Sequence, residues 1–551
     1  MSHMFAVAQL AQELQKEVDE GSFFGTPLTY LIFAPLLGAL VMMLVPKTEE
    51  VVHKVLALAT SLITAGIGVY VLSAFKYGSE AGKMQFTCNL PWISAINSRY
   101  ILGVDGISLP MLALTLFVVP LCIIYSWNHF PEPKNPKAFL ILILILETGM
   151  IGSFITRDLI LFFVFFEVVL LPMYFMIGVW GGEQRQYASI KFFLYTLFGS
   201  ALMIVAFLAI YFLSNKVQLP DGTVAHTFNM ELLRGAATVI PASTAIWIFG
   251  GLFVGFGIKV PMFPFHTWLP DAHTQAPTVG SVILAAVLLK LGTYGFIRIA
   301  LPILPDAART WAPIIGILAC VGIIYGALCC LAQTDMKRLI AFSSVAHMGY
   351  VMLAISTLTD FGINAAIFGM VAHGLITGML FFIAGSTKER YHTLEIKRLG
   401  GLLVQAPRMG WILGFCVMAS LGLPGLAGFW GEFPAILSAY EAGISGTQSF
   451  GLDQTLFRVL MVVAAIGTVF AAGYLLWLFQ RVAFGTPKEE FANDSHIHDA
   501  VPSEYMAWVP MLILIVVFGF VPGLMLNVSN PAVTEMVQQM YQTVAASGGG
   551  R

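Results

Sequence analysis

Long apolar segments are the feature that most constrains the fold of this chain. Segments of about 20 mainly apolar residues, the length at which a helix crosses a bilayer, recur with short polar gaps from Pro27 to Asn527. Only 11% of the 551 residues are charged, against about 25% in soluble domains, so a large soluble enzyme body is excluded. We therefore predict an all-α polytopic membrane protein. About fourteen transmembrane helices are expected, at residues 27–46, 53–75, 107–127, 137–155, 158–180, 187–213, 243–265, 276–298, 311–332, 337–358, 361–385, 408–440, 456–484 and 506–527.

The segments form a single membrane domain, predicted at residues 27–530. A polar N-terminal segment, 1–26, precedes it and a C-terminal tail, 531–551, follows it. Inside the loop before the third helix, residues 84–92 and 99–106 predict two short strands of a hairpin. Short loops on one side of the membrane hold more Lys and Arg than those on the other, which predicts both termini on the external (P) side.

Composition also excludes some functions. A net charge of -2 gives no basic face for nucleic acid. The six cysteines have no spacing that suits zinc or an iron–sulfur cluster. We therefore expect no metal and no cofactor in this chain.

Ionisable residues inside the apolar segments are the strongest functional signal. Each costs about 2.5 to 3.5 kcal/mol at mid-membrane, so each must pair, lose its charge or face water. They are Glu147, Glu167, Lys259, Lys290, His347, His373 and Glu432. Burial raises carboxylate pKa values and lowers those of Lys and His, so the three types can exchange protons, and we predict a proton relay.

Structural alternatives exist for several of these residues. Glu167 and Lys259 can form a buried ion pair that only fixes helix packing. A single histidine, His347 or His373, can be a hydrogen-bonded core residue, and Glu147 can lie near the membrane interface.

Two predicted helices are broken by proline and glycine, near 259–270 and near 421–432. Irregular backbone at membrane depth occurs only where protein or a hydrated cavity satisfies it. The breaks lie five helices apart. Because consecutive helices alternate in direction, an odd offset means that the two broken helices cross the membrane in opposite directions. We therefore predict two inverted five-helix repeats, roughly 137–298 and 311–484, each with one broken helix. The alternative is two unrelated proline kinks.

Four stretches of this sequence resemble the antiporter-like proton-pumping subunits of respiratory complex I, most closely the subunit M (chain 4) type. They are Phe165–Tyr174, Lys259–Pro277, Asp335–Gly349 and Gly422–Phe433. The resemblance implies that Glu167 pairs with Lys259, that Lys290 links to the second half, and that Glu432 ends the path. It also implies histidines on the central hydrophilic axis, matched by His266, His347 and His373.

The resemblance implies one proton-translocating membrane subunit of an NADH-quinone oxidoreductase. Redox chemistry from NADH to quinone would occur in partner subunits, which hold the flavin, the iron–sulfur clusters and the quinone, while this chain holds no redox centre. Expected partners are other membrane and peripheral complex I subunits, especially neighbouring antiporter-like subunits, and the lipid bilayer. We expect a bacterial plasma membrane, since no transit peptide is recognised. Alternatives are a subunit of an Mrp-like Na+(K+)/H+ antiporter and a passive structural subunit.

Overall fold

The computed structural model describes residues 22–219, 222–442, 450–492, 494 and 496–548. Within these residues, thirteen helices are long and apolar enough to cross a membrane. The remaining predicted helix, 408–440, is present as two shorter helices on either side of a break. The predicted all-α polytopic membrane fold is therefore confirmed. The predicted segment 1–26 lies largely outside the described residues.

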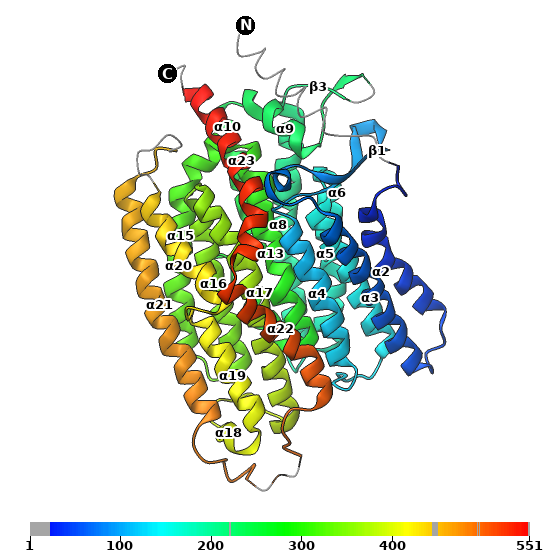
Figure 1. Ribbon diagram of the computed structural model, residues 1–551, viewed down its shortest axis with the longest axis vertical. Helices are drawn as coiled ribbons and strands as arrows, with labels where there is room; N and C mark the ends of the chain where they lie inside the picture. The colour runs from blue at the N-terminus through cyan, green and yellow to red at the C-terminus, as the bar shows by residue number, and fades with distance from the viewer. Residues whose placement is uncertain (1–21, 220–221, 443–449, 493, 495, 549–551) are drawn as a thin grey trace.

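Four helices from the N-terminal part of the chain form one lateral side of the molecule (Figure 1). They are α2 (Pro27–Leu44), α3 (Glu50–Ala74), α4 (Leu109–Ser126) and α5 (Pro136–Ile155). The side chains of Thr26 and Asn135 cap the N-termini of α2 and α5. α5 is mostly buried, whereas α2 and α3 expose much of their apolar surface, as expected of helices that face lipid.

The predicted hairpin is present between α3 and α4. Strands β1 (Gln85–Ile93) and β2 (Ser98–Val104) pair antiparallel, with short turns η1 (Gly78–Gly82) and η2 (Ser94–Ile96) beside them. β2 is buried along its whole length, and its backbone holds the chain after α5, because Arg157 N donates to Ile101 O.

The middle of the chain contains the first break. Its elements are α6 (Leu159–Val168), α7 (Leu170–Trp180), α8 (Arg185–Leu213), β3 (Val217–Gln218), β4 (Val224–Ala225), α9 (Met230–Ala236), η3 (Ala237–Val239), α10 (Ala242–Lys259) and α11 (Trp268–Gln275). α6 and α7 together form one span, capped by Asp158. The helix ends at Lys259 and resumes at Trp268, because the segment between contains Pro261 and Pro264, which lack the amide that a helix needs.

The span after this break is irregular. It runs through α12 (Thr278–Ile283), η4 (Leu284–Leu288), α13 (Leu289–Gly295), η5 (Phe296–Ala300) and α14 (Leu301–Ile303), and both η4 and η5 are π-helical. The sequence predicted a regular helix over 276–298. A π-helical turn contains one more residue than an α-helical turn, so apolar periodicity alone does not reveal it.

The centre of the molecule is built from spans that are buried over their whole apolar length. These are the α12 to α14 span and the helices α16 (Met336–Ser356) and α17 (Asp360–Tyr391). α15 (Pro305–Leu331) packs on α16 from outside. Side chains on these central helices are therefore shielded from lipid, which is where ionisable groups in a membrane protein are expected.

The second break separates α19 (Pro407–Ser420) from α20 (Ala427–Glu441), with the short helix α18 (Leu402–Gln405) before them. Gly422 and Gly425 lie in the break with φ of 70° and 94°, a backbone region that favours glycine. α21 (Gln454–Ala483) follows at the other lateral side of the molecule (Figure 1). Both predicted breaks are thus present, and the inverted repeats stay a prediction.

The last two helices are α22 (Pro502–Phe520) and α23 (Gly523–Gly548), which cross the face seen in Figure 1. Residues 531–548, predicted as part of a tail, continue α23. That helix packs on η1 and α17, because Val533, Met536, Val537 and Met540 form a buried apolar stripe.

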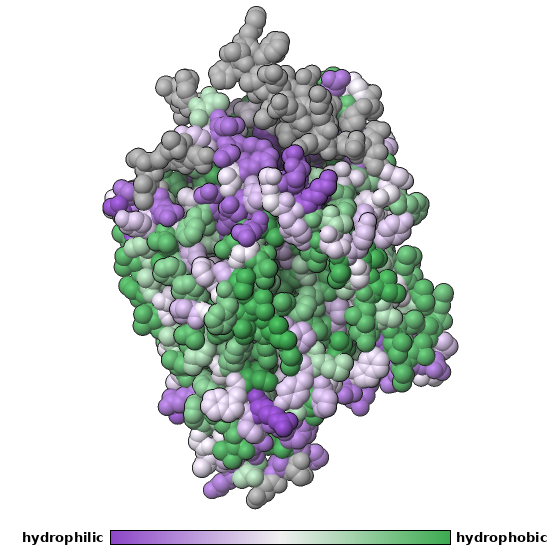
Figure 2. Space-filling view, viewed as in Figure 1, coloured by the Kyte–Doolittle hydropathy of each residue, from purple (hydrophilic) through white to green (hydrophobic). Residues whose placement is uncertain are grey.

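The molecule has two polar ends and an apolar belt between them (Figure 2). We call the end with β1, α9 and the C-terminal half of α23 the hairpin end, and the opposite end the α18 end (Figure 1). The belt is where the bilayer contacts the protein.

Candidate functional site

Glu167 and Lys259 lie near each other at the first break. Lys259 is the last residue of α10 and is buried, with its Nζ 4.8 Å from the centroid of the Phe166 ring. Glu167 follows Phe166 on α6, and its charge acts on Lys259. Among the described residues, however, no ion pair within 4.0 Å joins the two. The structure therefore places Glu167 and Lys259 near each other without a direct ion pair.

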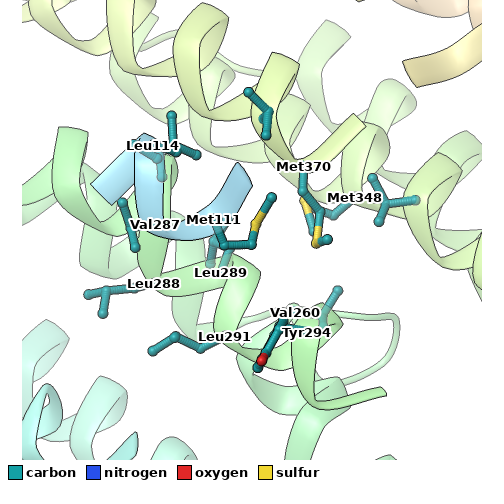
Figure 3. Close-up of a cluster of buried hydrophobic side chains, with 14 of the residues drawn as sticks. Met111, Leu114, Val260, Val287, Leu288, Leu289, Leu291, Tyr294, Met348 and Met370 are labelled. Carbon is teal, nitrogen blue, oxygen red and sulfur yellow. The ribbon is translucent and has the colours of Figure 1, made fainter. Parts of the chain in front are cut away.

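Lys290 lies on α13 in the fully buried central span. Its Nζ donates to the carbonyl of Ala285, in the preceding π-helical turn, and lies 2.7 Å from Nδ1 of His373. The neighbouring Leu288, Leu289 and Leu291 belong to an apolar cluster (Figure 3). Lys290 is thus an ionisable group in an apolar interior, bound to one carbonyl and one histidine.

A file of neighbouring side chains leads from Lys290 to the second break. His373 on α17 lies beside His347 on α16, with ring centroids 6.1 Å apart. Nδ1 of His347 is 2.6 Å from Oε1 of Glu432 on α20. We call Lys290, His373, His347 and Glu432 the central file.

The space around the second half of this file is polar and tightly enclosed. Nε2 of His347 lies 3.2 Å from Oγ of Ser420 and 3.3 Å from the hydroxyl of Tyr474. A cavity of about 20 Å³ lined by His347, His373 and Glu432 has room for about one water molecule. Since Nε2 of His373 has no protein partner in the described part of the chain, water there is the natural link between the two histidines.

His266 lies in the first break, apart from the central file. Its ring stacks 5.7 Å from Phe263 and meets Tyr325 edge-on at 5.0 Å. Its Nδ1 has no hydrogen-bond partner within the described residues. The structure does not join His266 directly to Lys259 or Lys290.

Glu147 is fully buried on α5. Neither of its carboxylate oxygens has a hydrogen-bond partner in the residues that the structure describes. Its side chain is shielded from both lipid and water by the surrounding helices. The structure does not bring it to the central file.

Two further ionisable residues lie between the central file and the α18 end. His273 on α11 is buried and stacks on Phe381 at 4.5 Å, and neither ring nitrogen has a partner among the described residues. Lys337 on α16 is buried, with its Nζ 2.5 Å from the carbonyl of Ala276. A cavity of about 380 Å³ at this end reaches Lys337.

Sequence reasoning did not single out these two residues. His273 lies between two predicted helices and Lys337 begins one, positions where a charge is ordinary, so only the packing of α11, α16 and α17 reveals that both are buried. The signal that was available is their place inside two of the four stretches that carry the resemblance.

The geometry fits proton transfer better than binding of a large ligand. His347 and Glu432 share a hydrogen bond, as do Lys290 and His373, so the pairs can pass a proton with little atomic motion. Within the described residues, no three His, Cys, Asp or Glu side chains cluster as a metal site would require. Fold and site together define a multi-pass membrane protein with a buried file of ionisable side chains.

Comparison with known proteins agrees with this description. The family model of the NADH:quinone oxidoreductase/Mrp antiporter transmembrane region matches residues 156–473. The model of the NADH-ubiquinone oxidoreductase chain 4 amino terminus matches residues 31–153.

Individual relatives match over nearly the whole chain. NADH-quinone oxidoreductase subunit M of Rickettsia bellii is 38% identical over 93% of this chain and 98% of its own length. NADH-ubiquinone oxidoreductase chain 4 of Arabidopsis thaliana is 36% identical over 93% of this chain and 97% of its own. A chain of respiratory complex I from Thermus thermophilus superposes with a TM-score of 0.80 at 27% identity, covering 93% of this chain and 99% of that one. The chain belongs to the NADH:quinone oxidoreductase/Mrp antiporter family and, within it, to the subunit M (chain 4) type of complex I.

Proposed function

We propose that this chain is a proton-translocating membrane subunit of an NADH-quinone oxidoreductase. The observation that carries the proposal is the central file, in which two hydrogen-bonded pairs, Lys290–His373 and His347–Glu432, lie end to end in the buried centre of the membrane domain and lead to the second break. Relatives that match almost end to end are named as subunit M or chain 4 of this enzyme. The chain acts as part of that enzyme complex.

Electrostatic coupling between Glu167 and Lys259 supplies the driving force for proton transfer within the chain. Two unit charges about 4 Å apart interact by about 4 kcal/mol at an effective dielectric near 20. When Glu167 and Lys259 move apart, the charged form of Lys259 loses this support. Its proton then moves toward Lys290, His373 and His347, and finally Glu432. The cavity beside Lys337 at the α18 end supports proton uptake from that end, with His273 between it and Lys290.

The remaining assignments follow from this function. Partners are the other membrane and peripheral subunits of the complex, including neighbouring antiporter-like subunits in the same membrane. Electron transfer from NADH to quinone, with its flavin and iron–sulfur clusters, takes place in those subunits. The membrane is a bacterial plasma membrane, with the hairpin end and both termini on the external side.

A Na+(K+)/H+ antiporter subunit is the second candidate. The Mrp complex from Dietzia sp. contains a chain that superposes with a TM-score of 0.78 over 94% of this chain, at 18% identity. At that identity the likeness supports the shared fold alone. The glutamate at the end of the file, Glu432, favours the subunit M type.

The test is NADH-driven proton uptake by vesicles that carry the complex with Lys259→Ala, with quinone reduction measured in parallel. We expect pumping to fall at least about tenfold, since losing about 1.4 kcal/mol of transition-state stabilisation does this. Quinone reduction should slow as well, and the unmutated complex should pump without Na+. Lys47→Ala, at an exposed position, is the matched control and should pump normally.

Each alternative gives a different outcome. Full pumping by Lys259→Ala and Glu167→Gln would show that the chain is a passive structural subunit. Pumping by the unmutated complex that requires Na+ or K+ would favour the antiporter.

A further inference from the structure

Three charged residues outside the central file meet in a buried layer at the hairpin end. Nη2 of Arg298, on η5, lies 2.5 Å from both carboxylate oxygens of Asp105, which follows β2. Nη2 of Arg157 lies 3.6 Å from Asp105 and 3.1 Å from Oγ of Ser108. The exposed fraction of each charged side chain is 2% or less. We call Asp105, Arg157 and Arg298 the arginine cluster.

The arginine cluster carries a fixed positive charge. Burial alone would raise the pKa of Asp105, but Arg298 and Arg157 outweigh it and hold that pKa well below its usual range. The amides of Ile107 and Ser108 also donate to this carboxylate. Two guanidinium groups therefore share one ionised carboxylate, which leaves one uncompensated positive charge.

The cluster stands between Lys290 and the hairpin end. Arg298 follows Lys290 by about two helical turns on the same span, and Tyr294 lies between them. The Tyr294 hydroxyl accepts from Nη1 of Arg157 and donates to the carbonyl of Phe154, both at 2.7 Å. Its ring belongs to the apolar cluster of Figure 3 and meets the ring of Phe154 edge-on. The Tyr294 side chain is thus held between Lys290 and the cluster by Arg157 and Phe154.

A small polar cavity lies on the other side of the cluster. It has a volume of about 40 Å³ and is lined by Asp105, Arg298 and Arg234, with α23 across it, which leaves room for about one or two water molecules. Arg234 is neutralised by Glu231 at 2.9 Å, and Glu535, also at the cavity, is exposed. Asp105, Glu231 and Glu535 line this cavity together with Arg234 and Arg298, so the excess positive charge lies with Arg157 and Arg298 on its buried side and not with the cavity as a whole.

The donors of the cluster exceed its acceptors. The Nε–H groups of Arg157, Arg234 and Arg298 have no acceptor among the described residues. Water beside them turns its oxygen toward the guanidinium groups and its hydrogens away, which interrupts a hydrogen-bonded proton wire. A fixed arginine charge also repels hydronium, as in pores that exclude protons.

We propose that the arginine cluster is an electrostatic seal that prevents protons from passing between the hairpin end and Lys290. The inference rests on the proposed function, in which Lys290 carries protons. Its role is to make the file conduct only along its length toward Glu432, so that protons pumped across the membrane do not return through the first half of the chain.

The test measures passive proton leak in vesicles that carry the whole complex, without NADH, after an imposed pH step. Arg298→Met removes the charge and keeps an apolar stem. We expect its proton conductance to rise about tenfold, which corresponds to a barrier about 1.4 kcal/mol lower. Arg298→Lys, which keeps the charge, should stay near the unmutated level. Arg298→Met combined with Lys290→Met should return to that level, because the leak runs through Lys290.

Arg390→Met is the matched control. Arg390 is also buried and bound to a carboxylate, that of Glu504 at 2.7 Å, but it lies toward the α18 end. The passive proton leak of the Arg390→Met complex should equal that of the unmutated complex. If Arg298→Met prevents assembly, Arg157→Gln tests the same seal, because it removes one charge and leaves the Asp105–Arg298 pair in place.

Two results would overturn the seal. One is an unchanged leak in an assembled Arg298→Met complex or, where that variant does not assemble, in Arg157→Gln. The other is a raised leak that persists when Lys290 is replaced as well. Failure of the proposed function is seen separately, as NADH-driven pumping that survives Lys259→Ala, and it does not change the comparison of passive leaks.

Discussion

At the scale of single residues, buried charge in this chain takes two forms. Asp105 and Arg298 form a closed ion pair with both carboxylate oxygens in contact. Lys290 and His373, in contrast, share one hydrogen bond between two groups that both gain and lose protons. A closed pair fixes its charges, whereas a chain of weakly partnered groups lets a proton move. In the proposed function, buried charged groups thus serve structure in one place and transport in another.

Asp105→Asn should be strongly destabilising near neutral pH, by about 3–5 kcal/mol, because it leaves buried guanidinium charge without its carboxylate. The low pKa of Asp105 in the folded protein fixes the sign of the pH dependence. The stabilisation is complete above the ordinary pKa of about 4 and is lost as the pH falls from there toward the lowered folded value. Thermal unfolding of the purified complex should therefore differ most between the two proteins at neutral pH. A difference that does not shrink below about pH 4 would contradict this account.

At the scale of elements, close helix contacts hold the ionisable side chains in place. Gly431 on α20 meets Gly369 on α17 so closely that an added Cβ would lie 2.6 Å from the Gly369 Cα. The next residue is Glu432, and α17 also carries His373. The two glycines therefore set the distance at which the second half of the central file closes.

Gly431→Ala should force α17 and α20 apart and destabilise the protein by about 1–3 kcal/mol, as overpacked cores do. The same movement weakens the His347–Glu432 hydrogen bond, so proton pumping should fall more than quinone reduction. The measurements are the inactivation temperature of the complex and its ratio of protons to electrons. Gly473→Ala is the control, since nothing lies within 4 Å of an added Cβ there. Equal behaviour of the two variants would refute the role of this contact.

At the scale of the whole molecule, the protein is an apolar belt between two polar ends (Figure 2). The most deeply buried spans are in the middle and carry Lys290, His347 and His373 of the central file, while α2, α3 and α21 expose their apolar faces. Lateral faces of this kind contact lipid or the neighbouring subunits of the complex. In the proposed function, proton transfer therefore takes place in the part of the protein that is shielded from lipid.

The orientation of the molecule can be tested with single cysteines. Ser94→Cys lies at the exposed turn of the hairpin, and Glu489→Cys lies in the exposed loop at the α18 end. In intact cells, a membrane-impermeant maleimide should label the first and reach the second only after permeabilisation. Five of the six native cysteines are buried and the sixth is partly so, so background labelling should be low. The opposite pattern would invert the topology proposed here.

The sequence by itself determined the membrane fold, because runs of about 20 apolar residues have only one stable environment. It also determined both helix breaks, since proline and glycine act through the local backbone. Glu167, Lys259, Lys290 and Glu432 could be identified from the sequence because an ionisable side chain inside an apolar segment is energetically unfavourable in a membrane.

Only the tertiary structure decided which of these residues meet. Helix packing placed His373 between Lys290 and His347, left Glu147 without a partner in the described chain, and buried His273 and Lys337. It also brought Asp105 to Arg298 across 193 residues of sequence and introduced the π-helical turns around Lys290. Such contacts depend on how each helix is rotated about its axis and how the helices cross. When a helix is apolar on nearly every face, its sequence has no clear apolar stripe from which that rotation can be predicted.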